Sequence, residues 1–118
     1  MDFRAKHRYA RIAPRKVRPV IDLVRGRPVN TALVNLKSTG RRGAPMIRKV
    51  IESALAGARQ AIAEKKLDLD ANDLLVAEAR VDEGPRLKRW KPRARGMAAP
   101  MQKRTCHIVV VLRPPWKE

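Results

Sequence analysis

Apolar residues recur at helical spacing in three segments of the first half of the chain. The first stripe predicts a short helix that starts at Pro14 and ends before Gly26, with Pro19 as a position where it kinks or begins late. The second stripe follows Pro28 and stops at residues 38–40, and the third runs from Pro45 over about four turns and predicts the longest helix. The stripes are Val17, Val20, Ile21 and Val24; Val29, Ala32, Leu33 and Leu36; and Ile47, Val50, Ile51, Ala54, Leu55, Ala58 and Ile62.

Alternation with a period of two marks three further segments. Near the N-terminus, Phe3, Ala5, His7 and Tyr9 share one face of an extended run, and the basic residues between them share the other. This pattern predicts a half-buried strand whose second face, with Arg4, Lys6 and Arg8, is wet or bound. Residues 74–82 and 103–112 are also strand-like, and we expect them to pair antiparallel.

The connection between these last two strands is unusually long. It has about 20 residues, whereas ordinary hairpin loops have about two to five. Residues 84–105 hold eight Lys or Arg and no Asp or Glu. Half of this connection, fully extended, would reach roughly 35 Å, so we expect a protruding arm. Its like charges and small apolar surface predict that the arm has no stable structure until a partner orders it.

Charge along the chain points to the kind of partner. The 118 residues suit a single domain, and their 44% hydrophobic content is enough for a folded core. The net charge is +17, from 28 Lys+Arg against 11 Asp+Glu. The excess lies in residues 1–27 (nine basic, two acidic) and 84–106 (eight basic, none acidic), while residues 44–83 are close to neutral. Such clustering favours a binding face for nucleic acid.

The arm has the residue types that contact RNA. Its lysines and arginines suit phosphate groups, and Trp90 offers a flat surface for base stacking. Pro92 and Pro100 stiffen the chain, and Gly96 permits a turn. Two simpler interpretations stay open: the segment is a solvated basic loop, or Trp90 packs within the protein.

Catalytic and metal-binding patterns are weak. Cys106 and His107 are adjacent on an expected strand and therefore point to opposite faces, so they do not form a catalytic pair. With His7 they lack zinc-finger spacing, and the aspartates in residues 68–73 lack the glycine and glutamate of an EF-hand. The single cysteine and the absence of a long apolar run predict a cytosolic protein with no membrane partner. We expect no catalytic residue, no metal and no cofactor.

Four motifs carry a family resemblance. PRKVR at residues 14–18, RG at 25–26, VDEGPRLKRWKPRARG at 81–96 and KRTCHI at 103–108 closely resemble the bacterial-type large-subunit ribosomal protein twenty-two family. Their order and spacing match across nearly the whole chain. The resemblance implies an α+β fold with three helices, a three-stranded antiparallel sheet and a long protruding β-hairpin, here at about residues 84–106 of a single domain, 1–118.

The resemblance also implies a function. The body would lie near the opening of the polypeptide exit tunnel, and the hairpin would penetrate large-subunit rRNA, tie its domains together and line the tunnel. Implied rRNA contacts are Arg15, Lys16, Arg18, Arg25, Arg86, Lys88, Arg89, Trp90, Lys91, Arg93, Arg95, Lys103 and Arg104. The implied tunnel-facing tip is Arg93, Arg95, Gly96, Met97, Ala98 and Ala99. Partners would be rRNA, neighbouring ribosomal proteins and the nascent chain, in the cytoplasmic ribosome and without homo-oligomers.

Two other classes compete with this interpretation. A transient RNA chaperone or assembly factor has the same charge pattern but washes off particles in high salt, because phosphate contacts weaken steeply as salt rises. An architectural DNA-binding protein would place the arm in a groove of the duplex.

Overall fold

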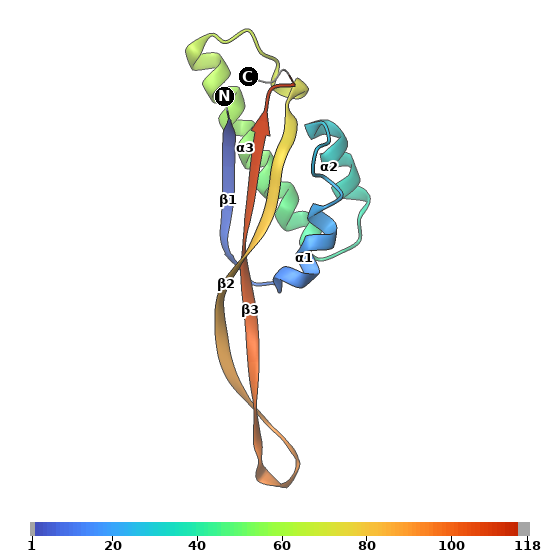
Figure 1. Ribbon diagram of the computed structural model, residues 1–118, viewed down its shortest axis with the longest axis vertical. Coiled ribbons are helices and arrows are strands. Elements are labelled where there is room, and N and C mark those ends of the chain that lie inside the picture. Colours follow the sequence, from blue (N-terminus) through green and yellow to red (C-terminus); the bar gives the residue numbers. More distant parts are fainter. Residues whose placement is uncertain (1, 116–118) are drawn as a thin grey trace.

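The computed structural model describes residues 2–115 and shows a body with a long arm (Figure 1). Three antiparallel strands, β1 (Phe3–Ala10), β2 (Leu75–Pro92) and β3 (Ala98–Arg113), form one sheet in the order β1-β3-β2. The helices are α1 (Pro14–Ile21), α2 (Val29–Ser38) and α3 (Gly43–Lys65), with short 3₁₀ turns η1 (Ala71–Asp73) and η2 (Ala94–Gly96). The α+β fold expected from the sequence is confirmed.

The end of α1 differs from its prediction. The helix starts at Pro14 as expected and continues through Pro19, but it ends at Ile21 rather than just before Gly26. Two backbone bonds to the edge of β2 explain the early end: the Gly26 N–H donates to the Val76 carbonyl, and the Val76 N–H donates to the Arg27 carbonyl. The chain must turn out of the helix to make this bridge, and Gly26 permits the turn because it adopts the left-handed region with a φ of +78°.

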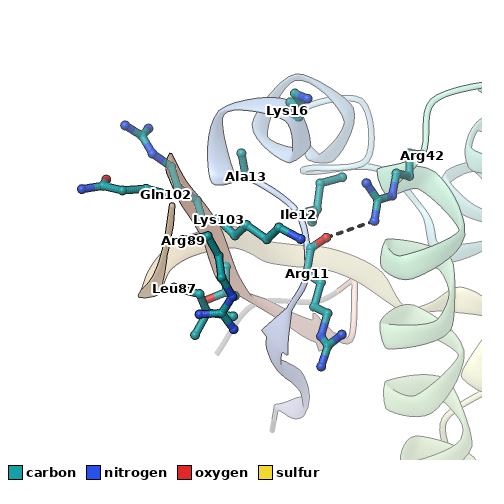
Figure 2. A pocket seen from close by; sticks show the side chains of 11 residues that line it. Arg11, Ile12, Ala13, Lys16, Arg42, Leu87, Arg89, Gln102 and Lys103 are labelled. Atoms are coloured by element: carbon teal, nitrogen blue, oxygen red, sulfur yellow. Dashed lines mark hydrogen bonds between the residues drawn. The ribbon is translucent and has the colours of Figure 1, made fainter. Parts of the chain in front are cut away.

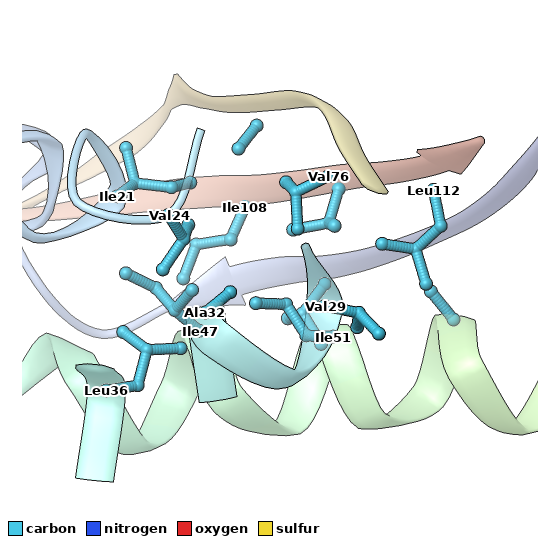
Figure 3. Packing of buried hydrophobic residues seen from close by; sticks show 14 of the residues in the cluster. Ile21, Val24, Val29, Ala32, Leu36, Ile47, Ile51, Val76, Ile108 and Leu112 are labelled. Carbon is cyan, nitrogen blue, oxygen red and sulfur yellow. The ribbon is translucent and has the colours of Figure 1, made fainter. Parts of the chain in front are cut away.

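The core lies between the helices and one face of the sheet. The face of α3 with Ile47 and Ile51 packs against the sheet side that carries Ile108 and Leu112 (Figure 3). Helix α2 follows its predicted bounds, and α3 begins two residues before Pro45. All three predicted apolar stripes therefore supply residues to one core, and α3 is its central element.

The opposite face of the sheet has no helix in the described part of the chain, yet the side chains at its centre are buried. Val109 and Val111 of β3 are only 2% and 1% exposed. In the ladder, Arg4 lies beside Val111, and Lys6 and Arg80 flank Val109. Aliphatic stems of such side chains cover apolar surface while their charges stay in water. The outer face is therefore a thin apolar strip beneath charged groups, and we call it the open face.

The prediction for Tyr9 is wrong. The alternation placed its side chain on the core face with Phe3, but the strand register shifts between His7 and Ala10. Tyr9 has a φ of +59° and is 53% exposed, while Ala10 is buried. A β-bulge inserts one residue into the strand and so moves every later side chain to the other face.

The arm is a two-stranded ribbon. Beyond a register shift between Glu83 and Arg86, β2 and β3 continue to pair as far as Pro92 and Ala98. The molecule is 68 Å long with a radius of gyration of 17.7 Å, whereas a compact chain of about 100 residues has roughly 13 Å. Two strands alone are marginally stable in water, and Arg86 faces Arg104 directly. That the isolated arm lacks stable structure stays a prediction.

The root of the arm depends on a glycine. A Cβ at Gly84 would lie 2.6 Å from the Thr105 Oγ1 and 3.2 Å from its carbonyl carbon. Thr105 is buried, and its hydroxyl donates to the Pro85 carbonyl at 2.6 Å, so it has little freedom to move. The close approach of the two strands therefore needs a residue without a side chain at position 84.

We expect Gly84→Ala to lower the free energy of unfolding by about 1–3 kcal/mol, the cost typical of overpacking. Urea denaturation followed by circular dichroism measures the change. The matched control is Gly57→Ala, since a Cβ there meets nothing within 4 Å and alanine favours a helix interior. Equal effects from the two substitutions would contradict this account of the root.

Candidate nucleic-acid interface

The ribbon displays its cations on both faces. Successive residues of a strand point to opposite faces, so Arg86, Lys88 and Trp90 of β2 project to one side, and Arg89 and Lys91 to the other. All five are exposed, and Trp90 is 71% exposed. The alternative that Trp90 packs within the protein is therefore wrong. A polyanion that surrounds the arm would meet positive charge and an aromatic ring from either side.

The tip is a tight reversal that carries two arginines. Residues 94–96 close the hairpin as a three-residue turn, because the Arg93 N–H donates to the Met97 carbonyl. Arg95 and Gly96 both have positive φ, 64° and 70°. Glycine adopts such a backbone without cost, so Gly96 fills the role expected of it. The predicted tip residues 93, 95, 96, 97, 98 and 99 lie together at the end of the molecule farthest from the body (Figure 1). Met97 is among the exposed large apolar side chains.

A groove lies where the arm leaves the body. It has a volume of about 550 Å³ and runs between the start of α1 and the root of the ribbon (Figure 2). Its lining contains six basic side chains and no acidic one. The full lining is Arg11, Ile12, Ala13, Lys16, Arg42, Leu87, Arg89, Gln102, Lys103, Arg104 and Thr105. Such a concave basic surface suits the phosphates of a folded nucleic acid.

The groove unites some predicted residues and adds others. Lys16 from the body lies in the same groove as Arg89, Lys103 and Arg104 of the arm. The resemblance implied an rRNA contact for each of these residues, and those contacts stay predictions. Sequence reasoning missed Arg11 and Arg42, whose side chains the fold brings together from distant parts of the chain. Arg42 Nη2 donates to the Arg11 carbonyl at 3.2 Å, which holds one wall of the groove in place (Figure 2). The only sequence signal for Arg11 was its position in the basic N-terminal stretch.

Two predicted RNA contacts also have a structural role. Arg25 donates from Nε and Nη2 to the Ala79 carbonyl at 3.0 and 2.7 Å, and from Nη1 to Asp22 at 2.6 Å. Arg18 donates to the Val81 carbonyl at 3.4 Å. These bonds fasten α1 and the turn after it to β2. Both side chains keep exposed surface, and their contact with RNA stays a prediction, as does that of the exposed Arg15.

The groups considered for catalysis or metal binding have other partners. Cys106 is buried, and burial raises the pKa of its thiol, while His107 lies on the open face and accepts a hydrogen bond from the Tyr9 N–H. Asp70 caps η1 by accepting from the Asn72 N–H at 2.9 Å. Within residues 2–115 no three His, Cys, Asp or Glu side chains gather as a metal site. The helices in the same range are all too short or too polar to cross a membrane.

A small α+β body with an acid-free basic groove and a long cationic ribbon is the architecture of a protein that binds structured nucleic acid. Comparison with known proteins gives the family. Residues 5–113 match the family model described as ribosomal protein L22p/L17e. The chain is 54% identical over 102 residues to the large ribosomal subunit protein uL22 of Lacticaseibacillus casei, which covers 86% of this chain and 83% of that one. It is 50% identical over 109 residues to uL22 of Lactobacillus gasseri, with 92% and 89% covered.

The chain therefore belongs to the ribosomal protein L22 family, as its motifs indicated. It is a structural protein of the large subunit of the cytoplasmic ribosome and not an enzyme. This membership also decides against a transient assembly factor or a DNA-binding protein as the main role.

Proposed function

We propose that the protein binds large-subunit rRNA through its ribbon and root groove, ties separate parts of that RNA together and lines the nascent-chain tunnel with its tip. The observation that carries the proposal is the ribbon itself. It projects from the body with exposed cations on both faces and no acid from residue 84 to residue 106. No packing partner within the described chain accounts for such a surface.

Binding follows from the placement of charge. The groove holds phosphates beside the body, and the ribbon contacts further phosphates along its length, so one protein spans RNA segments that are far apart. Exposed Trp90 adds stacking, which tolerates any base. Specificity then comes mainly from the shape of the folded RNA, and neighbouring ribosomal proteins complete the setting.

The tip supports the tunnel assignment by its chemistry. A tight turn with Arg93, Arg95 and exposed Met97 ends the molecule, so a passing nascent chain would meet long, flexible side chains there. The membership of the family and the length of the arm agree with this placement.

We expect the protein to remain on large particles after a wash in high salt, and its tip to contact a nascent chain. A photo-crosslinking residue at Met97 should crosslink to a radiolabelled nascent chain on stalled ribosomes. The same residue at Val34, an exposed position on α2 in the body, should not. Release by salt, or equal crosslinking from both positions, would contradict the proposal.

A further inference from the structure

Tyr9 occupies an unusual place on the open face. Its φ of +59° lies in the left-handed region, which bulky residues rarely adopt. Strained backbone of this kind collects at functional sites, where surrounding contacts hold it in place. Tyr9 is the single tyrosine of the chain, and the bulge turns it outward rather than into the core.

Neighbouring side chains hold the Tyr9 ring in position. The backbone N–H of Tyr9 donates to His107 Nδ1 at 3.0 Å, and the rings of Tyr9 and His107 meet edge to face with centroids 4.9 Å apart. The Arg8 guanidinium carbon lies 5.2 Å from the Tyr9 ring centroid, and Arg8 Nη2 donates to the phenol oxygen at 3.3 Å. Three contacts with the ring, besides the backbone hydrogen bond, thus hold an aromatic group that is still 53% exposed. The ring therefore has a defined place on the open face, and part of its surface remains accessible to a ligand.

The charges around this ring are positive. Arg4, Lys6 and Arg8 alternate along β1 on the open face, and none of them has an acidic partner within 4 Å in residues 2–115. The acid closest to His107 in the ladder is Asp82, and Arg80 binds that carboxylate at 3.3 Å. A ligand at Tyr9 therefore meets an aromatic surface and free cations together.

We infer that Tyr9, supported by His107 and Arg8, docks one unstacked nucleobase of RNA. An RNA strand supplies both parts of the match: a base for the ring, and flanking phosphates for Arg8 and Lys6. Because Nδ1 of His107 accepts the Tyr9 N–H, a neutral imidazole carries its proton on Nε2 and presents it as a donor. The inference rests on the proposed RNA-binding function and adds a site on the body, beside the root of the ribbon.

A fluorine label tests the site directly, because replacing tyrosine with 3-fluorotyrosine labels Tyr9 alone. We expect tetra-adenylate RNA to shift the single ¹⁹F resonance in a saturable way. Inorganic polyphosphate of equal charge supplies the anions without the base and should leave the resonance nearly unchanged. Equal shifts with both probes, or no shift with the RNA, would overturn the inference.

Two variants separate the ring from the fold. Tyr9→Asn removes the ring, and asparagine tolerates the left-handed backbone, so the bulge is kept. Tyr9→Phe keeps the ring. We expect Tyr9→Asn to weaken binding to large-subunit rRNA roughly 5- to 100-fold, the range of one base stacked on an aromatic side chain, and Tyr9→Phe to stay within about threefold.

The outcomes distinguish this site from the proposed function. Equal affinity of Tyr9→Asn and the unchanged protein would overturn the base-docking site and leave rRNA binding by the arm intact. Unchanged affinity for naked rRNA with weaker retention on assembled particles would also overturn it, and would point to a protein neighbour. Failure of the unchanged protein to bind rRNA would overturn the proposed function as well.

Discussion

Replacing residues 88–102 with Asn-Gly is expected to leave the body folded and to weaken binding to large-subunit rRNA by about two orders of magnitude or more. Leu87 and Lys103 face each other in the ladder, so a two-residue turn closes the shortened hairpin directly. The buried core lies in the body, and the removed segment is exposed along almost its whole length. The melting temperature should therefore change little.

The salt dependence shows why affinity falls. The replacement removes five cations: Lys88, Arg89, Lys91, Arg93 and Arg95. Each phosphate contact contributes roughly 0.7–0.9 to the slope of log affinity against log salt, so the slope should drop by about 3–5. Filter binding between 50 and 200 mM salt measures it, and thermal melts check the body. A melted body would refute the claim that the body folds without the arm. An unchanged slope would refute the claim that the arm's cations contact phosphates.

Helices were predicted well because their signal is local. The apolar stripes of α2 and α3 record which side of each helix meets the core, and that side is fixed by spacing alone. The end of α1 was not predicted, because it depends on bonds between Gly26, Arg27 and Val76, which lie about fifty residues apart. A tertiary contact decided where the helix stops.

The strands show the same limit in a different form. Alternation placed Phe3 and Ala5 correctly but failed at Tyr9, since period-two reasoning assumes an unbroken ladder and a bulge breaks it. Nothing near Tyr9 in the sequence marks the bulge. Its partner, His107, is 98 residues away.

The sequence predicted which residues make up the arm of the candidate interface, but not the groove at its root. An acid-free run predicted the arm, and the family motifs implied a hairpin, which the ladder from Arg86 to Pro92 confirms. The groove was not foreseen, because Arg42 belongs to a segment between helices with no RNA-binding signal of its own. Only the packing of α3 against the N-terminal strand brings it beside Arg11.

If the groove holds RNA, cations that line it should matter more for binding than cations elsewhere on the surface, at the same net charge. We expect Arg89→Glu with Lys103→Glu to weaken binding to large-subunit rRNA about 100-fold. Both residues line the groove, where phosphates of the bound RNA would meet two new negative charges in place of two cations.

A control with the same change in net charge makes the test decisive. Arg59→Glu with Lys65→Glu alters two exposed residues in the C-terminal half of α3, at the end of the molecule opposite the tip (Figure 1). Charges beyond a Debye length of about 8 Å are largely screened at physiological salt, so this pair should cost no more than about threefold. Competition binding with both variants, each checked by circular dichroism, gives the comparison. Equal losses would mean that the +17 field as a whole drives association, and the groove would then have no special part in holding RNA.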